Sequence, residues 1–170
     1  ARLLVERGAC PCVTPDGAQV IYSDGGALFR VSIDGGVPEK LPCDTGLRDL
    51  ECSPDGRWVL GVGETESGGR LRLMAFDLRD SRLYALPESG SASAEAGFWS
   101  PTGAQFCYTA TEPGVARTAA AAGATIRIAD FRPDTLRDPS VTAEESPVRF
   151  AIIGNRPNPF NPSTTIEFAL

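Results

Sequence analysis

Short apolar segments separated by turns rich in glycine and proline run through the whole chain. In residues 70–78 apolar and polar positions alternate, so that Leu71, Leu73 and Ala75 share one face, which is the period of a half-buried strand. The 18 glycines and 14 prolines separate these segments, as is usual in all-β proteins. Only residues 115–122 have a helix-compatible composition, and about eight residues are too few for a stable isolated helix. The pattern predicts an all-β fold.

One tetrapeptide recurs between these segments. Thr14-Pro15-Asp16-Gly17 returns after 39 residues as Ser53-Pro54-Asp55-Gly56, and after a further 47, in altered form, as Ser100-Pro101-Thr102-Gly103. Proline fixes φ near −65°, aspartate bonds its own backbone two residues on, and glycine can adopt positive φ. Each copy follows one apolar segment and precedes another, so it predicts the same tight reversal between two strands. A repeat of about 40 residues is in the range of a propeller blade.

The repeat predicts a partial β-propeller of about three four-stranded antiparallel blades. A tight hairpin is expected at 24–26, a longer hairpin loop at 64–69, and an expanded one at 112–123. The proline-rich, charged stretch that follows the third repeat has no apolar periodicity and reads as a linker. The expected divisions are the last strand of a preceding blade over 1–8, blades over 9–48, 49–94 and 95–138, a linker over 139–150, and a separate segment over 151–170.

Three blades do not close a ring of the usual four to eight. The first residue is Ala1 and the only methionine is Met74, so we read the sequence as a fragment or a processed chain whose remaining blades lie elsewhere. An incomplete ring exposes strand edges, so we expect edge-strand self-association.

Charge and hydropathy narrow the range of partners. The net charge of −6 argues against nucleic acid, whose binding requires clustered cations. No apolar run approaches the roughly 20 residues of a membrane-spanning helix, so no transmembrane segment is expected.

The five cysteines are Cys10, Cys12, Cys43, Cys52 and Cys107, with no Cys-x-x-Cys pair and no histidine in the chain, which argues against a metal site. Cys43 and Cys52 are close enough in sequence to form a disulfide in an exported protein. Alignment of the turns instead places Cys52 and Cys107 where other blades have core residues. We therefore favour buried thiols at these two positions.

The residues offer little for catalysis. Without histidine a Ser-His-Asp triad cannot form, and no Gly-x-Ser-x-Gly elbow is present. Asp16 and Asp55 have a structural role in equivalent turns, and the third copy has Thr102 in that place. Trp58 and Trp99 are expected to pack between blades rather than to stack on a ligand. We predict no catalytic, cofactor-binding or metal-binding residues and no cofactor.

The Ser/Thr-Pro-Asp-Gly turn, followed by a strand, a glycine-containing hairpin and a second strand, resembles the TolB-type propeller repeat. Such propellers serve protein association or accompany the catalytic domain of exported peptidases. The resemblance covers residues 9 to about 138 and is weaker in the third repeat.

The tail contains Pro157-Asn158-Pro159-Phe160-Asn161-Pro162, followed by a strand-like alternation over 165–170. This motif resembles the opening of the Ig-like C-terminal domain that marks bacterial proteins for type IX secretion, and of its flagellar hook-cap-like relatives. The resemblance implies one extended strand from a truncated sandwich, and secretion machinery as a partner of the full-length parent. It also implies export through the periplasm to the bacterial cell surface or the medium.

Two functions follow as expectations. The first is a non-enzymatic protein-binding or scaffold module of an exported bacterial protein, whose loops contact a protein or glycan. The alternative is an accessory propeller of a secreted peptidase or other hydrolase whose catalytic domain lies outside this chain.

Overall fold

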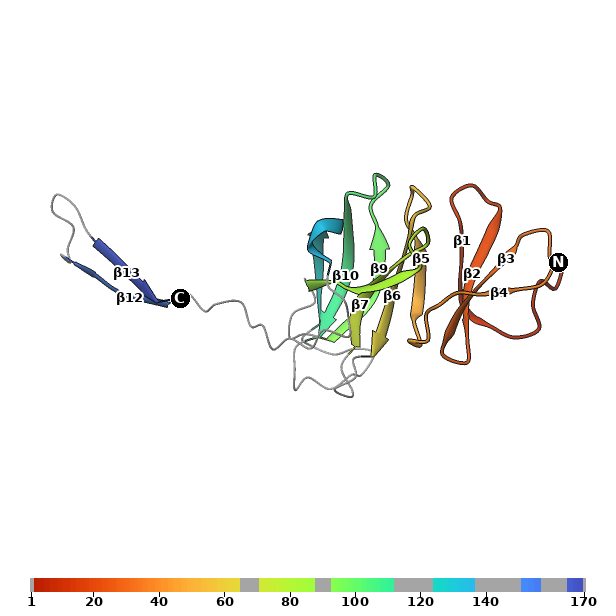
Figure 1. The fold of residues 1–170 in the computed structure, drawn as a ribbon, viewed down its shortest axis with the longest axis horizontal. Helices are drawn as coiled ribbons and strands as arrows, with labels where there is room; N and C mark the ends of the chain where they lie inside the picture. The colour runs from red at the N-terminus through yellow and green to blue at the C-terminus, as the bar shows by residue number, and fades with distance from the viewer. Residues whose placement is uncertain are drawn as a thin grey trace. The chain divides into compact units, whose positions relative to one another are not determined.

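The computed structural model describes residues 2–64, 71–87, 93–111, 124–136, 151–156 and 165–169, the last two ranges by their backbone alone. The chain divides into two compact units, Ala1–Pro139 and Ser140–Leu170 (Figure 1). Four expected features lie outside the described residues: the hairpin loop at 65–69, the insertion at 112–123, the linker over 139–150 and the motif at 157–162. Within the described residues no helix is long and apolar enough to cross a membrane.

The first unit is a row of antiparallel sheets, the architecture of a partial propeller. Two sheets have four strands in chain order, and the third, within the described residues, has the three-stranded order β11-β10-β9. A short 3₁₀ helix, Pro133–Thr135, follows the third sheet. The strands are β1 (Ala9–Val13), β2 (Gln19–Asp24), β3 (Ala27–Ser32) and β4 (Glu39–Lys40); β5 (Arg48–Cys52), β6 (Trp58–Glu64), β7 (Leu71–Asp77) and β8 (Arg82–Ala85); β9 (Ser93–Trp99), β10 (Gln105–Thr111) and β11 (Ala124–Asp130). The all-β partial propeller predicted from the repeat is confirmed.

The repeated tetrapeptides join the first two strands of each blade. In the first copy the Asp16 carboxylate accepts hydrogen bonds from the Thr14 hydroxyl at 2.6 Å and from the Ala18 amide at 3.0 Å, and Gly17 has φ of +71°. The second copy repeats these contacts around Asp55, and in the third the Thr102 hydroxyl replaces the carboxylate. The recurring feature is therefore a backbone reversal that both side chains can support.

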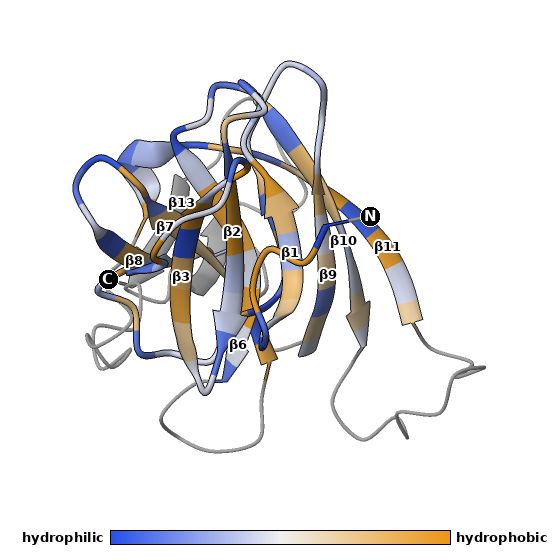
Figure 2. Cartoon of the chain, turned by 90° about the vertical axis from the view of Figure 1, so that its right-hand side faces the viewer, coloured by the Kyte–Doolittle hydropathy of each residue, from blue (hydrophilic) through white to orange (hydrophobic). Residues whose placement is uncertain are grey.

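Two apolar clusters hold adjacent blades together. Ile21 and Leu28 of the first blade pack with Val59 and Phe76 of the second. On the opposite side of the second sheet, the apolar side chains of β6 and β7 pack with those of the third blade: Leu60, Val62, Leu71 and Leu73 against Ala94, Phe106, Tyr108 and Ala110. Figure 2 shows hydrophobic bands along the strands, β11 among them, and hydrophilic turns. Burial between sheets is thus the main source of stability.

Residues 2–8 do not form the strand expected at the start of the chain. Leu4 and Val5 instead pack on Val20, Tyr22 and Val31, on the outer face of the first blade. A strand needs a partner for its backbone groups, and this segment pairs with none of the described strands.

The second unit contains two strands rather than the single one expected. β12 (Ala151–Arg156) pairs antiparallel with β13 (Thr165–Ala169), with a register shift between Ile152 and Gly154. The expectation of one isolated strand was wrong because residues 151–156 provide the partner that satisfies its backbone hydrogen bonds.

Candidate functional site

The first strand of each blade carries a bulge at the same position. Cys10, Asp49 and Ala96 have φ of +50°, +52° and +42°, and each precedes the first residue of its tetrapeptide by four positions. The strand pairing shifts register at all three places. Left-handed backbone is unfavourable for cysteine and alanine and better tolerated by aspartate, and bulges re-aim neighbouring side chains. Sequence reasoning missed this feature, because none of the three residues is a glycine; its one signal is the fixed spacing from the turns.

Two shallow cavities lie beside these bulges, each between consecutive blades. The first, about 490 Å³, is lined by residues 7–9, 23–26, 46 and 47. The second, about 480 Å³, is lined by Arg48 and Asp49 of β5, Val62 of β6, Leu71 of β7 and Glu95 of β9. Both are open to solvent. Open, partly charged depressions suit contact with a surface or a polar ligand better than enclosure of an apolar molecule.

A second repeated contact joins the first strands of adjacent blades. Between the first and second blades, Cys12 Sγ lies 3.1 Å from Cys52 Sγ. Between the second and third, the Trp99 amide donates to Glu51 Oε2 at 2.8 Å and the Trp99 indole donates to the Glu51 carbonyl at 3.3 Å. Cys12 and Glu51 both stand two residues before their turn, and Cys52 and Trp99 one residue before theirs. The propeller therefore uses one inter-blade position twice, with different chemistry.

Burial and hydrogen bonding shift the ionisation of these groups. Burial raises the pKa of Glu51 above its ordinary value, although the hydrogen bond from Trp99 opposes the shift. The pKa of Cys12 is raised by its hydrogen bond with Cys52 and by burial, whereas that same hydrogen bond lowers the pKa of Cys52. Cys52 is therefore the more acidic of the two thiols.

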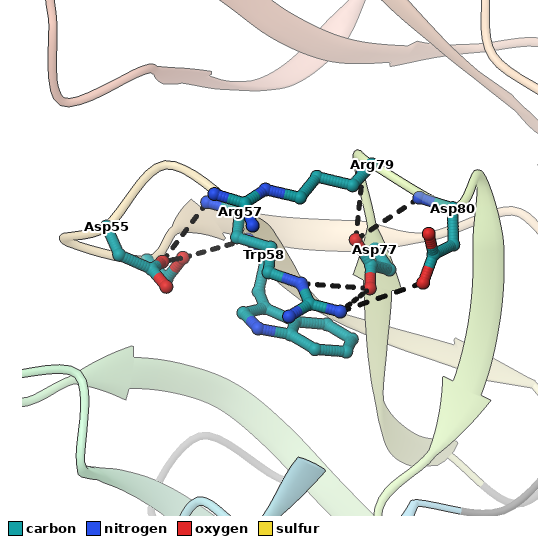
Figure 3. A network of polar contacts seen from close by, with 7 residues as sticks. Asp55, Arg57, Trp58, Asp77, Arg79 and Asp80 are labelled. Carbon is teal, nitrogen blue, oxygen red and sulfur yellow. Dashed lines mark hydrogen bonds and ion pairs between the residues drawn. The ribbon is translucent and has the colours of Figure 1, made fainter.

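Asp77, which the sequence reading did not single out, is the centre of a buried polar network (Figure 3). Arg57 donates to Asp77 Oδ2 from Nε at 3.1 Å and from Nη2 at 2.7 Å, while the Arg79 and Asp80 amides donate to Oδ1 at 2.9 and 3.4 Å. Burial alone raises the pKa of Asp77, but these hydrogen bonds outweigh it and hold the pKa below its ordinary value. The guanidinium also lies 4.8 Å over the Trp58 ring. With its carboxylate satisfied in this way, Asp77 stabilises the blade and is not available as an acid or base.

The two tryptophans pack between blades, as expected. Trp58 meets Phe131 edge-on at 5.2 Å between ring centroids, and Trp99 meets Phe131 at 4.7 Å and Phe106 at 6.1 Å. Phe131 follows β11, so the Trp58–Phe131 contact joins the second blade to the third. The ring contacts of Trp99 lie within the third blade, and its indole reaches the second blade through the Glu51 carbonyl. Neither indole is presented as a stacking platform.

The cysteines differ from expectation. All five are free, and the alternative Cys43–Cys52 disulfide is not formed. Cys43 is the buried thiol, while Cys52 and Cys107, expected to be buried, are only partly covered. Cys107 pairs with Ile128 of β11 and Phe98 of β9, so it lies on the same face of the third sheet as these two exposed side chains. Among the described residues, no group of three or more histidine, cysteine or acidic side chains could hold a metal ion.

Comparison with solved structures reveals the fold. The chain is similar to a protein assigned as TolB from Agrobacterium tumefaciens (18% identity, 76% of this chain and 48% of that chain, TM-score 0.63). It is also similar to TolB from Acinetobacter baumannii (19% identity, 78% and 32%, TM-score 0.59) and to the tricorn protease (12% identity, 75% and 14%, TM-score 0.54). The chain spans about half the length of the first of these and less of the others. The sequence matches no protein-family model and no curated protein at significant similarity. The fold is thus that of TolB-like propellers.

Proposed function

We propose that this chain is a non-enzymatic protein-binding or scaffold segment of a larger β-propeller in an exported bacterial protein. The observation that carries the proposal is the apolar outer face of the third blade. Adjacent blades pack through side chains at equivalent positions of their strands. The residues at these positions in the third blade therefore indicate what its outer face can bind.

The register equivalence is direct. In each blade, the first residue of the second strand pairs with the last residue of the third strand. Leu28, Leu73 and Ile126 each lie four residues before that last residue, so they occupy equivalent positions in the three blades. Leu28 and Leu73 are 0% exposed because the next blade covers them, whereas Ile126 is 85% exposed. An isoleucine this exposed forgoes the roughly 1.5–3 kcal/mol of a buried one.

Neighbouring positions extend this apolar face. Ile128, on the same side of β11, is 69% exposed, and Phe98 of β9 is 57% exposed. Phe98 stands two residues before its turn, the position through which Cys12 and Glu51 reach the following blade. We name Phe98, Ile126 and Ile128 the third-blade face. A contiguous apolar face of this kind is typical of an interaction surface.

The chemistry of this face fits another propeller blade. At the opposite end of the row, the outer face of the first blade is covered by Leu4 and Val5. In a solution of the purified chain, the available partner for the third-blade face is therefore the same face of a second copy, which gives a twofold dimer. In the parent protein, the partner is a further blade or another protein that presents a sheet.

Export is supported by the resemblance of residues 157–162 to a type IX secretion motif, and by the likeness of the fold to TolB proteins of two bacteria. The two open cavities offer a place for a polar ligand such as a glycan on the same blades. The alternative, an accessory propeller of a secreted hydrolase, is supported by the likeness to the tricorn protease. A parent reading frame with a nucleophile elbow and a histidine outside this segment would favour that alternative.

The scaffold proposal is tested by light scattering on the 170-residue chain over roughly a hundredfold range of concentration. We expect concentration-dependent dimers that the double variant Ile126→Asp/Ile128→Asp converts to monomers with an unchanged circular dichroism spectrum. Val37→Asp is the matched control, because Val37 is 94% exposed and lies outside the third-blade face. A wild-type chain that is monomeric throughout contradicts the proposal, and dimers that persist in the double variant indicate edge pairing instead.

A further inference from the structure

We propose that Cys12 and Cys52 are a disulfide-forming pair that covalently joins the first and second blades under oxidising conditions. Their sulfur atoms are 3.1 Å apart, closer than two sulfurs in ordinary contact, and a disulfide requires a separation of about 2.05 Å. The approach needed is therefore about 1 Å, within reach of small side-chain rotations. The inference rests on this contact and does not depend on the proposed function.

The backbone around the pair is well anchored. Cys12 pairs with Ile21 in the first sheet, and Cys52 pairs with Val59 in the second. Both thiols are partly buried against the apolar cluster between the two blades. The equivalent position at the next junction is held by the Glu51–Trp99 hydrogen bonds, so this is a place where adjacent blades regularly meet. Within the described part of the chain, no other two cysteine sulfurs are in hydrogen-bonding contact.

The reaction is thiol–disulfide exchange with a small or protein disulfide. The Cys52 thiolate attacks one sulfur of the external disulfide, forms a mixed disulfide and releases one thiol. Cys12, after losing its proton, then attacks the Cys52 sulfur and releases the second thiol. The two protein thiols lose two electrons and two protons, and the external disulfide is reduced to two thiols.

Cys52 is suited to the first step because the hydrogen bond from Cys12 favours its thiolate. Cys12, whose proton is retained by the same hydrogen bond, is suited to resolve the mixed disulfide once Cys52 no longer carries a negative charge. The opposite pKa directions of the two thiols thus favour attack by Cys52 first and by Cys12 second.

The bond closes a loop of 40 residues between two blades. A cross-link of this length restricts the unfolded chain and is expected to stabilise both blades. Oxidation should raise the melting temperature by about 4–16 °C, the shift that corresponds to typical disulfides in a domain of this size.

The test compares the full chain after incubation with oxidised glutathione and with dithiothreitol. We expect a mass loss of about 2 Da on oxidation and, after trypsin, one linked species that joins residues 8–30 to residues 49–57. Cys12→Ser and Cys52→Ser should each abolish the linked species and the thermal shift. Because residues 8–30 also contain Cys10, Cys10→Ser is the matched control, and it should retain both.

The controls separate the pair from general thiol reactivity. Cys43→Ser removes the buried thiol of the same cluster, and after oxidation it should still give the linked species. Circular dichroism of each reduced variant checks that it is folded. A wild-type chain that gains only mixed disulfides with glutathione, a link that survives Cys12→Ser, or a bridge that lowers the melting temperature would overturn the proposal.

Discussion

Asp77→Ala should destabilise the second blade more than any other substitution of a charged side chain in the described residues. The Asp77 carboxylate is 1% exposed and receives hydrogen bonds from the Arg57 side chain and from two backbone amides. Loss of one partner of a buried ion pair costs about 3–5 kcal/mol. The Arg57 side chain is 32% exposed and can turn toward water, so we expect a loss near the lower end of this range, about 3 kcal/mol.

Asp80→Ala is the matched control. Asp80 contacts the same guanidinium at 3.6 Å, but its side chain is 59% exposed, and exposed ion pairs contribute about 0–1 kcal/mol. Urea unfolding at pH 7 is followed by tryptophan fluorescence, with one slope of unfolding free energy against urea concentration used for all variants. It gives the loss of unfolding free energy for Asp77→Ala and for Asp80→Ala. Equal losses for the two variants, or a loss below about 0.5 kcal/mol for Asp77→Ala, would refute the reasoning.

The same network predicts a pH dependence. The pKa of Asp77 is lowered in the folded state. The contribution of Asp77 to the free energy of unfolding is therefore fully present above the ordinary aspartate pKa of about 3.9, and it is lost as the pH falls through the lower pKa of the folded state. The difference in unfolding free energy between wild type and Asp77→Ala should therefore be constant from pH 7 to about pH 5 and shrink below about pH 4. A difference that grows on acidification would contradict the lowered pKa.

Two further predictions concern glycines. An added Cβ at Gly97 would lie 2.6 Å from Leu60 Cδ2 and 3.0 Å from Leu73 Cδ2. Gly97→Ala should therefore lower the free energy of unfolding by about 1–3 kcal/mol, measured by thermal or urea unfolding. Gly46→Ala should cost much less, because its Cβ would meet only Gly26 Cα at 3.6 Å. Equal effects would argue against tight packing between the second and third blades. Gly17→Val and Gly56→Val should each lower the free energy of unfolding by about 1–3 kcal/mol, because φ is +71° and +69° at these turns. Gly17→Asn should cost less, since asparagine tolerates this conformation. Unchanged melting curves for both valine variants would count against the turn geometry.

The fold was predictable where local chemistry determines the backbone. The tetrapeptides at 14–17, 53–56 and 100–103 specify their reversals through proline, a short polar side chain and glycine, and the apolar segments around them can form only sheets that stack. The tight hairpin at 24–26 follows from two consecutive glycines, with φ of +57° and +86°.

Features set by the pairing of strands and by contacts between sheets were not predictable. Cys10, Asp49 and Ala96 adopt left-handed backbone because of the register between strands, although none of them favours it. Cys12 and Cys52 meet because two blades lie face to face, whereas the sequence favoured a buried thiol at Cys52 and offered a bridge to Cys43 as the alternative. The position of Asp77 at the end of an apolar strand gave no sign of its partner, Arg57, 20 residues away.

The proposed role of the third-blade face is tested most directly by hydrogen–deuterium exchange on the purified chain at low and high protein concentration. If this face binds another blade, raising the concentration should increase protection in Ser93–Trp99, Gln105–Thr111 and Ala124–Asp130, leave Ala9–Lys40 unchanged, and have no effect in the Ile126→Asp/Ile128→Asp variant. Protection that is independent of concentration, or that changes only in the first blade, would contradict the account.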